Sequence, residues 1–124
     1  MLFRSSNGSA VVGLVKSGKV KAIAQTGKGR LASLPDIPAM SDTLPGFEGY
    51  DWNGVFVPHG TPAPIVQKLN AGLNQALASP LVSTRFADLN VESRQNTPEE
   101  FGAYIEAQMA LWSRVVKDAN IKLG

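Results

Sequence analysis

Three hydroxyl–proline pairs set the helix starts in the second half of the chain. They are Thr61-Pro62, Ser79-Pro80 and Thr97-Pro98. In each pair the hydroxyl residue suits the N-cap, and the proline suits the first helical position, where its missing N–H costs no hydrogen bond. Glu100 follows the third pair at the spacing of a capping box. This half of the chain is therefore predicted to form three consecutive helices.

Each of these predicted helices carries an apolar stripe at helical spacing. The first stripe comprises Ile65, Val66, Leu69, Leu73 and Leu77, and the second comprises Leu81, Val82, Phe86 and Leu89. The third stripe comprises Phe101, Ile105, Met109, Trp112, Val115 and Val116. Stripes of this kind are more often core than cofactor contacts, so we expect them to pack against other elements.

The first half of the chain mixes a short helix with candidate strands. Residues 9–16 are predicted to form a helix that Ser9 caps and Gly18 ends. Residues 1–3 and 19–25 suit strands on either side of it, which makes a β-α-β unit. Residues 26–50 hold seven glycines and prolines and no regular period, so they indicate an ordered connection between lobes, with one helical turn at 41–43. Residues 53–57 and 91–94 are further short strand candidates.

Composition excludes several classes of site. The 124 residues contain no cysteine and one histidine, His59, which leaves nothing for a thiolate metal centre, a multi-histidine site or thiol catalysis. We therefore expect no metal, no cofactor and no catalytic residues, with a small hydrolase around His59 as the enzymatic alternative. No apolar run reaches the length of a membrane span, and the first residues do not form a secretion signal.

Charge is unevenly distributed along the sequence. Residues 1–30 carry six lysines and arginines and no acid, whereas residues 31–124 carry six basic and ten acidic residues. Such a front segment could meet an anionic ligand or an acidic surface, or its lysines could be solvated at a strand edge. Residues 4–30 contain no aromatic side chain for stacking on bases, so we expect no nucleic-acid partner. Residues 27–30 lack the spacing of a phosphate loop and are interpreted as a basic turn.

Two places are candidate ligand contacts. Ser5, Ser6 and Asn7 form a polar run between the first predicted strand and the first helix, which is where open α/β sheets bind ligands. A solvated loop is the alternative for this run. Trp52 either packs against the helices that follow it or lines a cleft.

The order of motifs resembles one protein family. The motifs are Lys16-Ser-Gly-Lys-Val-Lys-Ala-Ile-Ala-Gln-Thr26, Leu34-Pro-Asp-Ile-Pro38, Pro45-Gly-Phe-Glu-Gly-Tyr50, Trp52-Asn-Gly-Val-Phe-Val-Pro58, Gly60-Thr-Pro62, Lys68-Leu-Asn-Ala71, Asn74-Gln-Ala-Leu-Ala-Ser-Pro80, Thr97-Pro-Glu-Glu-Phe101, Trp112 and Val115-Val-Lys117. Together they resemble the substrate-binding receptors of tripartite tricarboxylate transporters, called Bug or TctC-type proteins. The resemblance implies a periplasmic, non-enzymatic receptor with two α/β lobes, which holds a small carboxylate through backbone amides, hydroxyls and waters and delivers it to membrane permease subunits.

The expected fold is therefore α/β and periplasmic-binding-protein-like, part of a two-lobe receptor with short strands and about four helices. Residues 1–25 are expected to be the end of the second lobe, 26–50 the crossover, and 51–124 the carboxy-terminal part of the first lobe. We expect a truncated receptor whose apolar faces lack their partners and whose copies self-associate. The alternative is a self-associating protein-interaction module without ligand binding. The chain departs from the family pattern at the front. Ser5-Ser6-Asn7-Gly8 stands where the family usually has an apolar strand that ends in a polar residue, often aspartate, and Gly13 stands where a helix proline is often seen.

Overall fold

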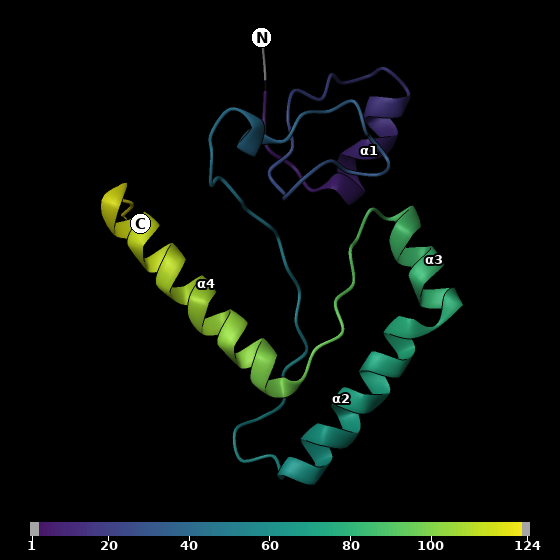
Figure 1. Cartoon of the computed structure of the whole chain (residues 1–124), viewed down its shortest axis with the longest axis vertical. Coiled ribbons are helices and arrows are strands. Elements are labelled where there is room, and N and C mark those ends of the chain that lie inside the picture. The colour runs from purple at the N-terminus through teal and green to yellow at the C-terminus, as the bar shows by residue number, and fades with distance from the viewer. Residues whose placement is uncertain (1–2, 123–124) are drawn as a thin grey trace. The chain divides into compact units, whose positions relative to one another are not determined.

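The structure, a computed structural model, describes residues 3–122, which contain four α-helices. These are α1 (Gly8–Lys16), α2 (Ala63–Ala78), α3 (Pro80–Asp88) and α4 (Pro98–Asp118), and a single 3-10 turn, η1 (Met40–Asp42), precedes α2 (Figure 1). The predicted first helix, the helical turn near residue 41 and the three later helices are thus confirmed. The predicted cap of the first helix is wrong, because Asn7 occupies the N-cap position and Ser9 lies inside α1. The only β pairing among the described residues is an isolated parallel bridge between Gln25 and Ala39.

The helix starts follow the hydroxyl–proline signals, with one correction. Thr97 caps α4 through a complete capping box: its Oγ1 accepts from the Glu100 N–H at 3.1 Å, and its own N–H donates to the Glu100 carboxylate at 2.8 Å. Thr61 does not cap α2, which begins one residue late with Pro62 at the N-cap position. The Thr61 hydroxyl instead donates to the Pro58 carbonyl at 2.8 Å, so it closes the preceding turn.

Three helices end in the same left-handed motif. Gly18, Asn90 and Asn120 have φ values of +73°, +55° and +51°. After α3, the N–H of Asn90 donates to the Ala87 carbonyl at 3.0 Å and the N–H of Val91 donates to the Phe86 carbonyl at 2.9 Å. These two bonds define a Schellman motif, which satisfies carbonyls that the helix leaves unpaired. Glycine and asparagine tolerate this conformation best, which explains their positions.

The predicted strands do not form among the described residues. Residues 19–24, 53–57 and 91–94 are irregular or extended coil, and of the first candidate strand only Phe3 is described and is also coil. A strand is stable only when a neighbour satisfies its backbone hydrogen bonds. Gln25 alone obtains such pairing: its N–H donates to the Pro38 carbonyl at 3.0 Å, and its carbonyl accepts from the Met40 N–H at 2.8 Å. The strand part of the α/β prediction is therefore not shown by this chain.

The chain divides into two compact units. One comprises Met1–Phe56 and Pro80–Ser93, and the other comprises Val57–Ser79 and Arg94–Gly124. In the first unit the Arg30 guanidinium pairs with the Asp42 carboxylate at 3.3 Å, and the N–H of Gly49 donates to the Thr26 carbonyl at 2.9 Å. The second unit consists of α2, α4 and their flanking residues. These units cut across the predicted segments 1–25, 26–50 and 51–124, whose assignment to lobes stays a prediction.

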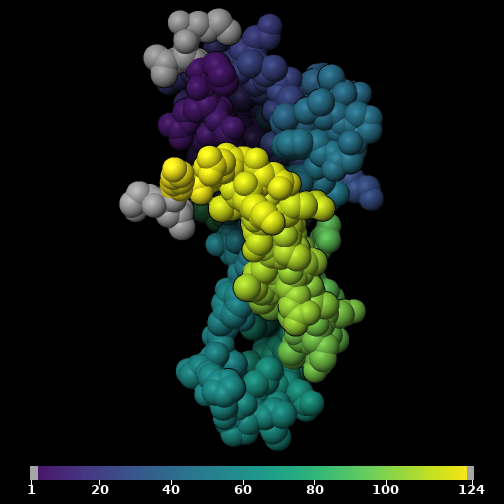
Figure 2. All heavy atoms as spheres, turned by 90° about the vertical axis from the view of Figure 1, so that its left-hand side faces the viewer, coloured from purple at the N-terminus to yellow at the C-terminus, as the bar shows by residue number. Residues whose placement is uncertain are grey.

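Very little of either unit is buried. Among residues 3–122, only Val12 and Ala39 are buried, with 6% and 2% of their surface exposed. The stripe of α4 is largely open: Met109 is 65% exposed and Trp112 is 48% exposed. Figure 2 shows the side chains of α4 at the surface of the face in view. The expectation that the apolar faces lie open is confirmed, whereas the expectation that these stripes form a core is wrong.

Candidate functional site

The polar run 5–7 is an exposed, extended segment that leads into α1. Asn7 occupies the N-cap position with φ −69° and ψ 144°, but its side chain makes no capping bond. Its Nδ2 instead donates to Oδ2 of Asp51 at 2.6 Å. Ser5 and Ser6 precede it and are exposed. The run therefore presents two hydroxyls and one amide beside the start of a helix.

The Asn7–Asp51 bond brings the two sequence-predicted places close together along the chain fold. Asp51 immediately precedes Trp52, which is partly buried, so a contact across 44 residues joins the run 5–7 to the tryptophan segment. Sequence reasoning did not identify Asp51, although a carboxylate next to a candidate cleft tryptophan was a usable signal. The negatively charged Asp51 carboxylate accepts the hydrogen bond of the Asn7 amide, which was expected to bind a ligand.

Tyr50, two residues before Trp52, contacts residues 27 and 28. The Lys28 N–H donates to the Tyr50 hydroxyl at 2.7 Å. A Cβ added at Gly27 would lie 2.9 Å from Cε1 of the Tyr50 ring, closer than real Cβ atoms come to other groups. The Gln25 side chain also bridges the Gly27 N–H and carbonyl, at 2.8 and 3.1 Å. Residues 27–30, which were interpreted as a basic turn, do form a bend at 27–29. This bend contacts the ring and the hydroxyl of Tyr50.

The start of α1 is electrostatically suited to an anion. Its first turn contains no acidic residue, and its last turn contains Lys16. The first N–H groups of a helix have no partners within the helix, and the helix dipole adds partial positive charge there. The carboxylate of Asp51, which accepts from Asn7 Nδ2, opposes this effect with its negative charge.

Other chemistry has little support among residues 3–122. They contain no group of three or more His, Cys, Asp or Glu side chains arranged to hold a metal ion. They also contain no helix whose length and apolar character would allow it to cross a bilayer. His59 is exposed in the turn 58–61, where Gly60 takes a φ of +83°.

The uneven charge of the sequence disappears in the folded units. The first unit holds seven basic and six acidic residues, and the second holds five and four, which together make the 12 and 10 of the chain. The acids of residues 31–56 and of α3 share a unit with the basic front. Each unit therefore has a net charge of +1. The expectation of no nucleic-acid partner stays a prediction.

Comparison with known proteins decides the family. A model of the tripartite tricarboxylate transporter family receptor matches residues 5–121, almost the whole chain. The chain belongs to this family. The resemblance stated from the motifs is thereby confirmed. Members of this family are solute-binding receptors, and the family is not one of enzymes.

Individual curated proteins are similar to this chain over most of its length. A UPF0065 protein of Bordetella bronchiseptica is 33% identical over 107 residues, which are 86% of this chain and 32% of that protein. Protein BugT of Bordetella pertussis is 30% identical over 118 residues, 94% of this chain and 36% of BugT. The chain thus spans about a third of the length of these relatives.

Solved receptor structures share the fold of this segment. The R. palustris protein Rpa4515, solved with adipate, superposes with a TM-score of 0.82 at 29% identity, over 94% of this chain and 39% of that one. The periplasmic binding protein BugD superposes with a TM-score of 0.79 at 37% identity, over 89% of this chain and 38% of BugD. The periplasmic-binding-protein-like part of the fold prediction is confirmed by these matches.

Proposed function

We propose that this chain is a segment of an extracytoplasmic solute receptor for small carboxylates that feeds a tripartite tricarboxylate transporter. The observation that carries the proposal is the family match over residues 5–121. The similarity to a receptor solved with adipate supports a dicarboxylate as the ligand class. The receptor would work in the periplasm, where BugD is a binding protein, and its partners would be the permease subunits in the membrane. It would act by binding alone, without cofactor, metal or catalytic group.

The same proposal places the chain within a two-lobe α/β architecture. Residues 1–25 would be the end of the second lobe, 26–50 the crossover and 51–124 the carboxy-terminal part of the first lobe. Support comes from the superposition of this chain on about 39% of the adipate-bound structure. Residues 19–24 and 53–57, which are bend or coil in this chain, would then be strands whose neighbours belong to the remaining parts of such a receptor.

Within this proposal, Ser5, Ser6, Asn7 and Trp52 contact the ligand. The two hydroxyls and the Asn7 amide donate hydrogen bonds to a carboxylate at the start of α1, as backbone N–H groups do in other anion sites. Trp52 supplies an apolar wall for the carbon chain of the acid. Asp51 competes with the ligand, because its carboxylate already accepts from Asn7 Nδ2 at 2.6 Å.

Isothermal titration calorimetry of the whole chain with adipate and a panel of other di- and tricarboxylates tests this function. Asn7→Ala and Ser6→Ala should weaken binding, whereas Asp51→Asn should strengthen it because it removes the competing charge. Ser83→Ala is the matched control, since Ser83 is exposed and its hydroxyl donates only to the Pro80 carbonyl of its own helix, at 3.2 Å. If no acid in the panel gives heat, this chain does not bind carboxylates by itself.

A self-associating interaction module without ligand binding is the second candidate. The small number of buried residues favours it, because open apolar faces of this extent are typical of surfaces that bind protein. This candidate predicts no heat with any acid and a stable oligomer in solution. A chain that binds a carboxylate and stays monomeric would contradict it.

A further inference from the structure

The chain contains two Asn-Gly pairs, which lie in different local structure. The pairs are Asn7-Gly8 and Asn53-Gly54. An asparagine that precedes glycine is prone to spontaneous deamidation, because glycine has no side chain to hinder attack by its own backbone nitrogen. The reaction requires the asparagine side chain and the following peptide unit to turn toward each other. The local structure at each pair therefore governs how fast it reacts.

Asn7 and Gly8 are held on both sides of the reacting bond. The Asn7 side chain donates through Nδ2 to Oδ2 of Asp51 at 2.6 Å. The Asn7 carbonyl accepts from the Ala10 N–H at 3.0 Å, which orients the peptide unit between Asn7 and Gly8 at the start of α1. These bonds have to open before Cγ of Asn7 can meet the Gly8 nitrogen, so the folded chain should react slowly here.

Asn53 and Gly54 lack these restraints. Both residues are exposed, and residues 51–57 form neither helix nor strand (Figure 1). In the described part of the chain, residues 3–122, neither the Asn53 side chain nor the Gly54 N–H forms a hydrogen bond. No hydrogen bond of this pair therefore has to open before Cγ of Asn53 meets the Gly54 nitrogen.

We propose that Asn53 is a site of spontaneous deamidation in the folded chain and that Asn7 is protected. The Gly54 backbone nitrogen loses its proton and attacks Cγ of Asn53. The side-chain nitrogen takes up a proton and leaves as ammonia, which closes a succinimide ring. Water then adds to either carbonyl of the ring, breaks that carbonyl's bond to the ring nitrogen and leaves aspartate or isoaspartate. Water is the only co-reactant, and nothing is oxidised or reduced.

Either product adds a negative charge directly after Trp52 and two residues after Asp51. The unit of residues 1–56 and 80–93 then has seven basic and seven acidic residues, so its net charge falls from +1 to zero. The isoaspartate product also routes the main chain through the former side chain, which lengthens the backbone by a methylene group. This inference does not rest on the proposed ligand function, because the reaction needs only the chain and water.

Peptide mass spectrometry of the whole chain tests the proposal after ageing in mildly alkaline buffer made with heavy-oxygen water. Opening of the ring incorporates a heavy oxygen, so acid formed during ageing is distinguished from acid formed later, during digestion in ordinary water. We expect position 53 to convert at least ~10-fold faster than position 7, because the hydrogen bond of Asn7 to a charged acceptor has to open first. A smaller difference, faster conversion at position 7 or no conversion at position 53 overturns the proposal.

Two variants and a denatured sample separate the effect of the fold from that of the sequence. Gly54→Ala keeps the reacting amide but hinders attack, so it should slow conversion at position 53. Asp51→Ala removes the acceptor of the Asn7 amide and should speed conversion at position 7. Circular dichroism checks that both variants keep their helix content. In guanidinium chloride the two positions of the wild-type chain should convert at similar rates. A difference that persists in the unfolded chain, or an Asp51→Ala variant that leaves position 7 unchanged, contradicts protection by the fold.

Discussion

Two asparagines on α2 hold the start of α4, and their removal should be strongly non-additive. Asn70 and Asn74 both donate through Nδ2 to the same Asn96 carbonyl, each at 2.9 Å. Asn74 also donates to the Asn70 side chain at 3.1 Å, and its Oδ1 accepts from the Asn96 N–H at 3.3 Å. The Gln95 side chain donates to the Asn74 carbonyl at 3.0 Å. We call this cluster the asparagine clasp.

The magnitude follows from which groups lose their partners. Asn74→Ala removes three hydrogen bonds worth ~0.5–1.5 kcal/mol each, and alanine returns about 0.5 kcal/mol through its higher helix propensity. The Asn96 carbonyl keeps its bond from Asn70 in this variant. We therefore expect a loss of about 1–4 kcal/mol in the free energy of unfolding. The double variant Asn70→Ala/Asn74→Ala leaves that part-buried carbonyl unpaired. It should therefore cost about 1 kcal/mol more than the sum of the single variants.

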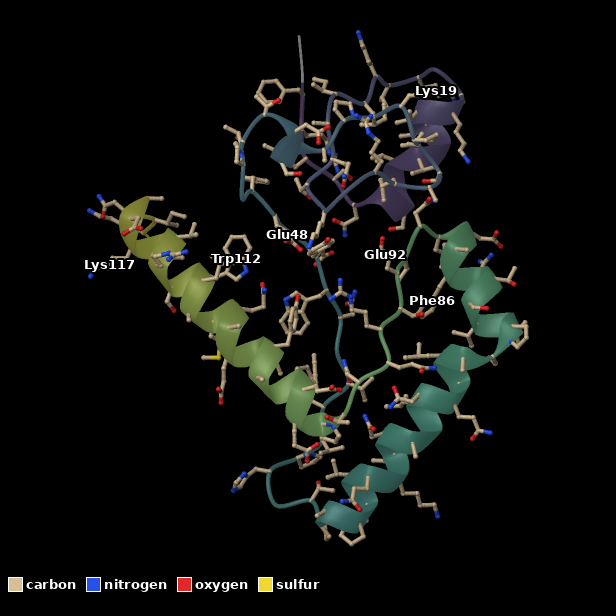
Figure 3. The ribbon with its side chains drawn as sticks, in the orientation of Figure 1. Lys19, Glu48, Phe86, Glu92, Trp112 and Lys117 are labelled. Atoms are coloured by element: carbon tan, nitrogen blue, oxygen red, sulfur yellow. The ribbon has the colours of Figure 1, made fainter. Side chains whose placement is uncertain are left out.

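The assay uses Trp112, which lies on α4 in the same unit as the clasp (Figure 3). Its indole Nε1 donates to the Gln108 side chain at 3.1 Å, so its fluorescence should report the state of α4. A Trp52→Phe background removes the other tryptophan, and urea unfolding then gives the free energies. Gln75→Ala is the control, exposed on the same helix and expected within ~0.5 kcal/mol of wild type. Additive losses, or an Asn74→Ala no worse than Gln75→Ala, would refute the reasoning.

Substitutions at three further positions test the hydrogen bonds and the backbone conformation described above. Thr97→Ala breaks the capping box of α4 and should lower its stability by about 1 kcal/mol, measured by urea unfolding, with Ser83→Ala as an exposed hydroxyl control. Asn90→Gly should be neutral or stabilising and Asn90→Ala should cost about 1 kcal/mol, since φ is +55°; a reversed order in thermal unfolding would contradict the motif. Ser33→Ala should stabilise the first unit by about 1 kcal/mol, because its buried Oγ has no hydrogen-bond partner; a loss of stability would show that this hydroxyl is paired.

The helices could be predicted because their signals are local. Thr97 and Glu100 are three residues apart, and the bonds between them form within one turn. Gly18 likewise ends α1 through bonds within the preceding turn. The left-handed Asn90 and Asn120 could also have been found, because each is an asparagine followed by an apolar residue at the end of a periodic segment. Such signals act whether or not the rest of a fold is present.

The strands could not be predicted in this way because their stability depends on neighbours distant in the sequence. Residues 19–25 have the alternation of a strand, yet only Gln25 pairs, and it pairs with Ala39. Residues 53–57 have the composition of a buried strand, yet Val55 and Phe56 are 67% and 65% exposed. Composition indicates what a segment can do in a sheet, whereas the sheet itself needs several strands side by side.

The candidate site likewise has one part that local sequence signals predict and one part that they do not. The position of Ser5, Ser6 and Asn7 ahead of α1 was predictable, because the helix start is a local signal. The bond from Asn7 to Asp51 was not, since it joins residues 44 positions apart and depends on how residues 26–50 fold back. Two contacts hold residue 50 against the bend at 27–29. The Tyr50 hydroxyl accepts from the Lys28 N–H, and the Tyr50 ring lies close to Gly27. The hydrogen bond of the Asn7 amide to the Asp51 carboxylate therefore depends on contacts between distant parts of the sequence, which local patterns do not predict.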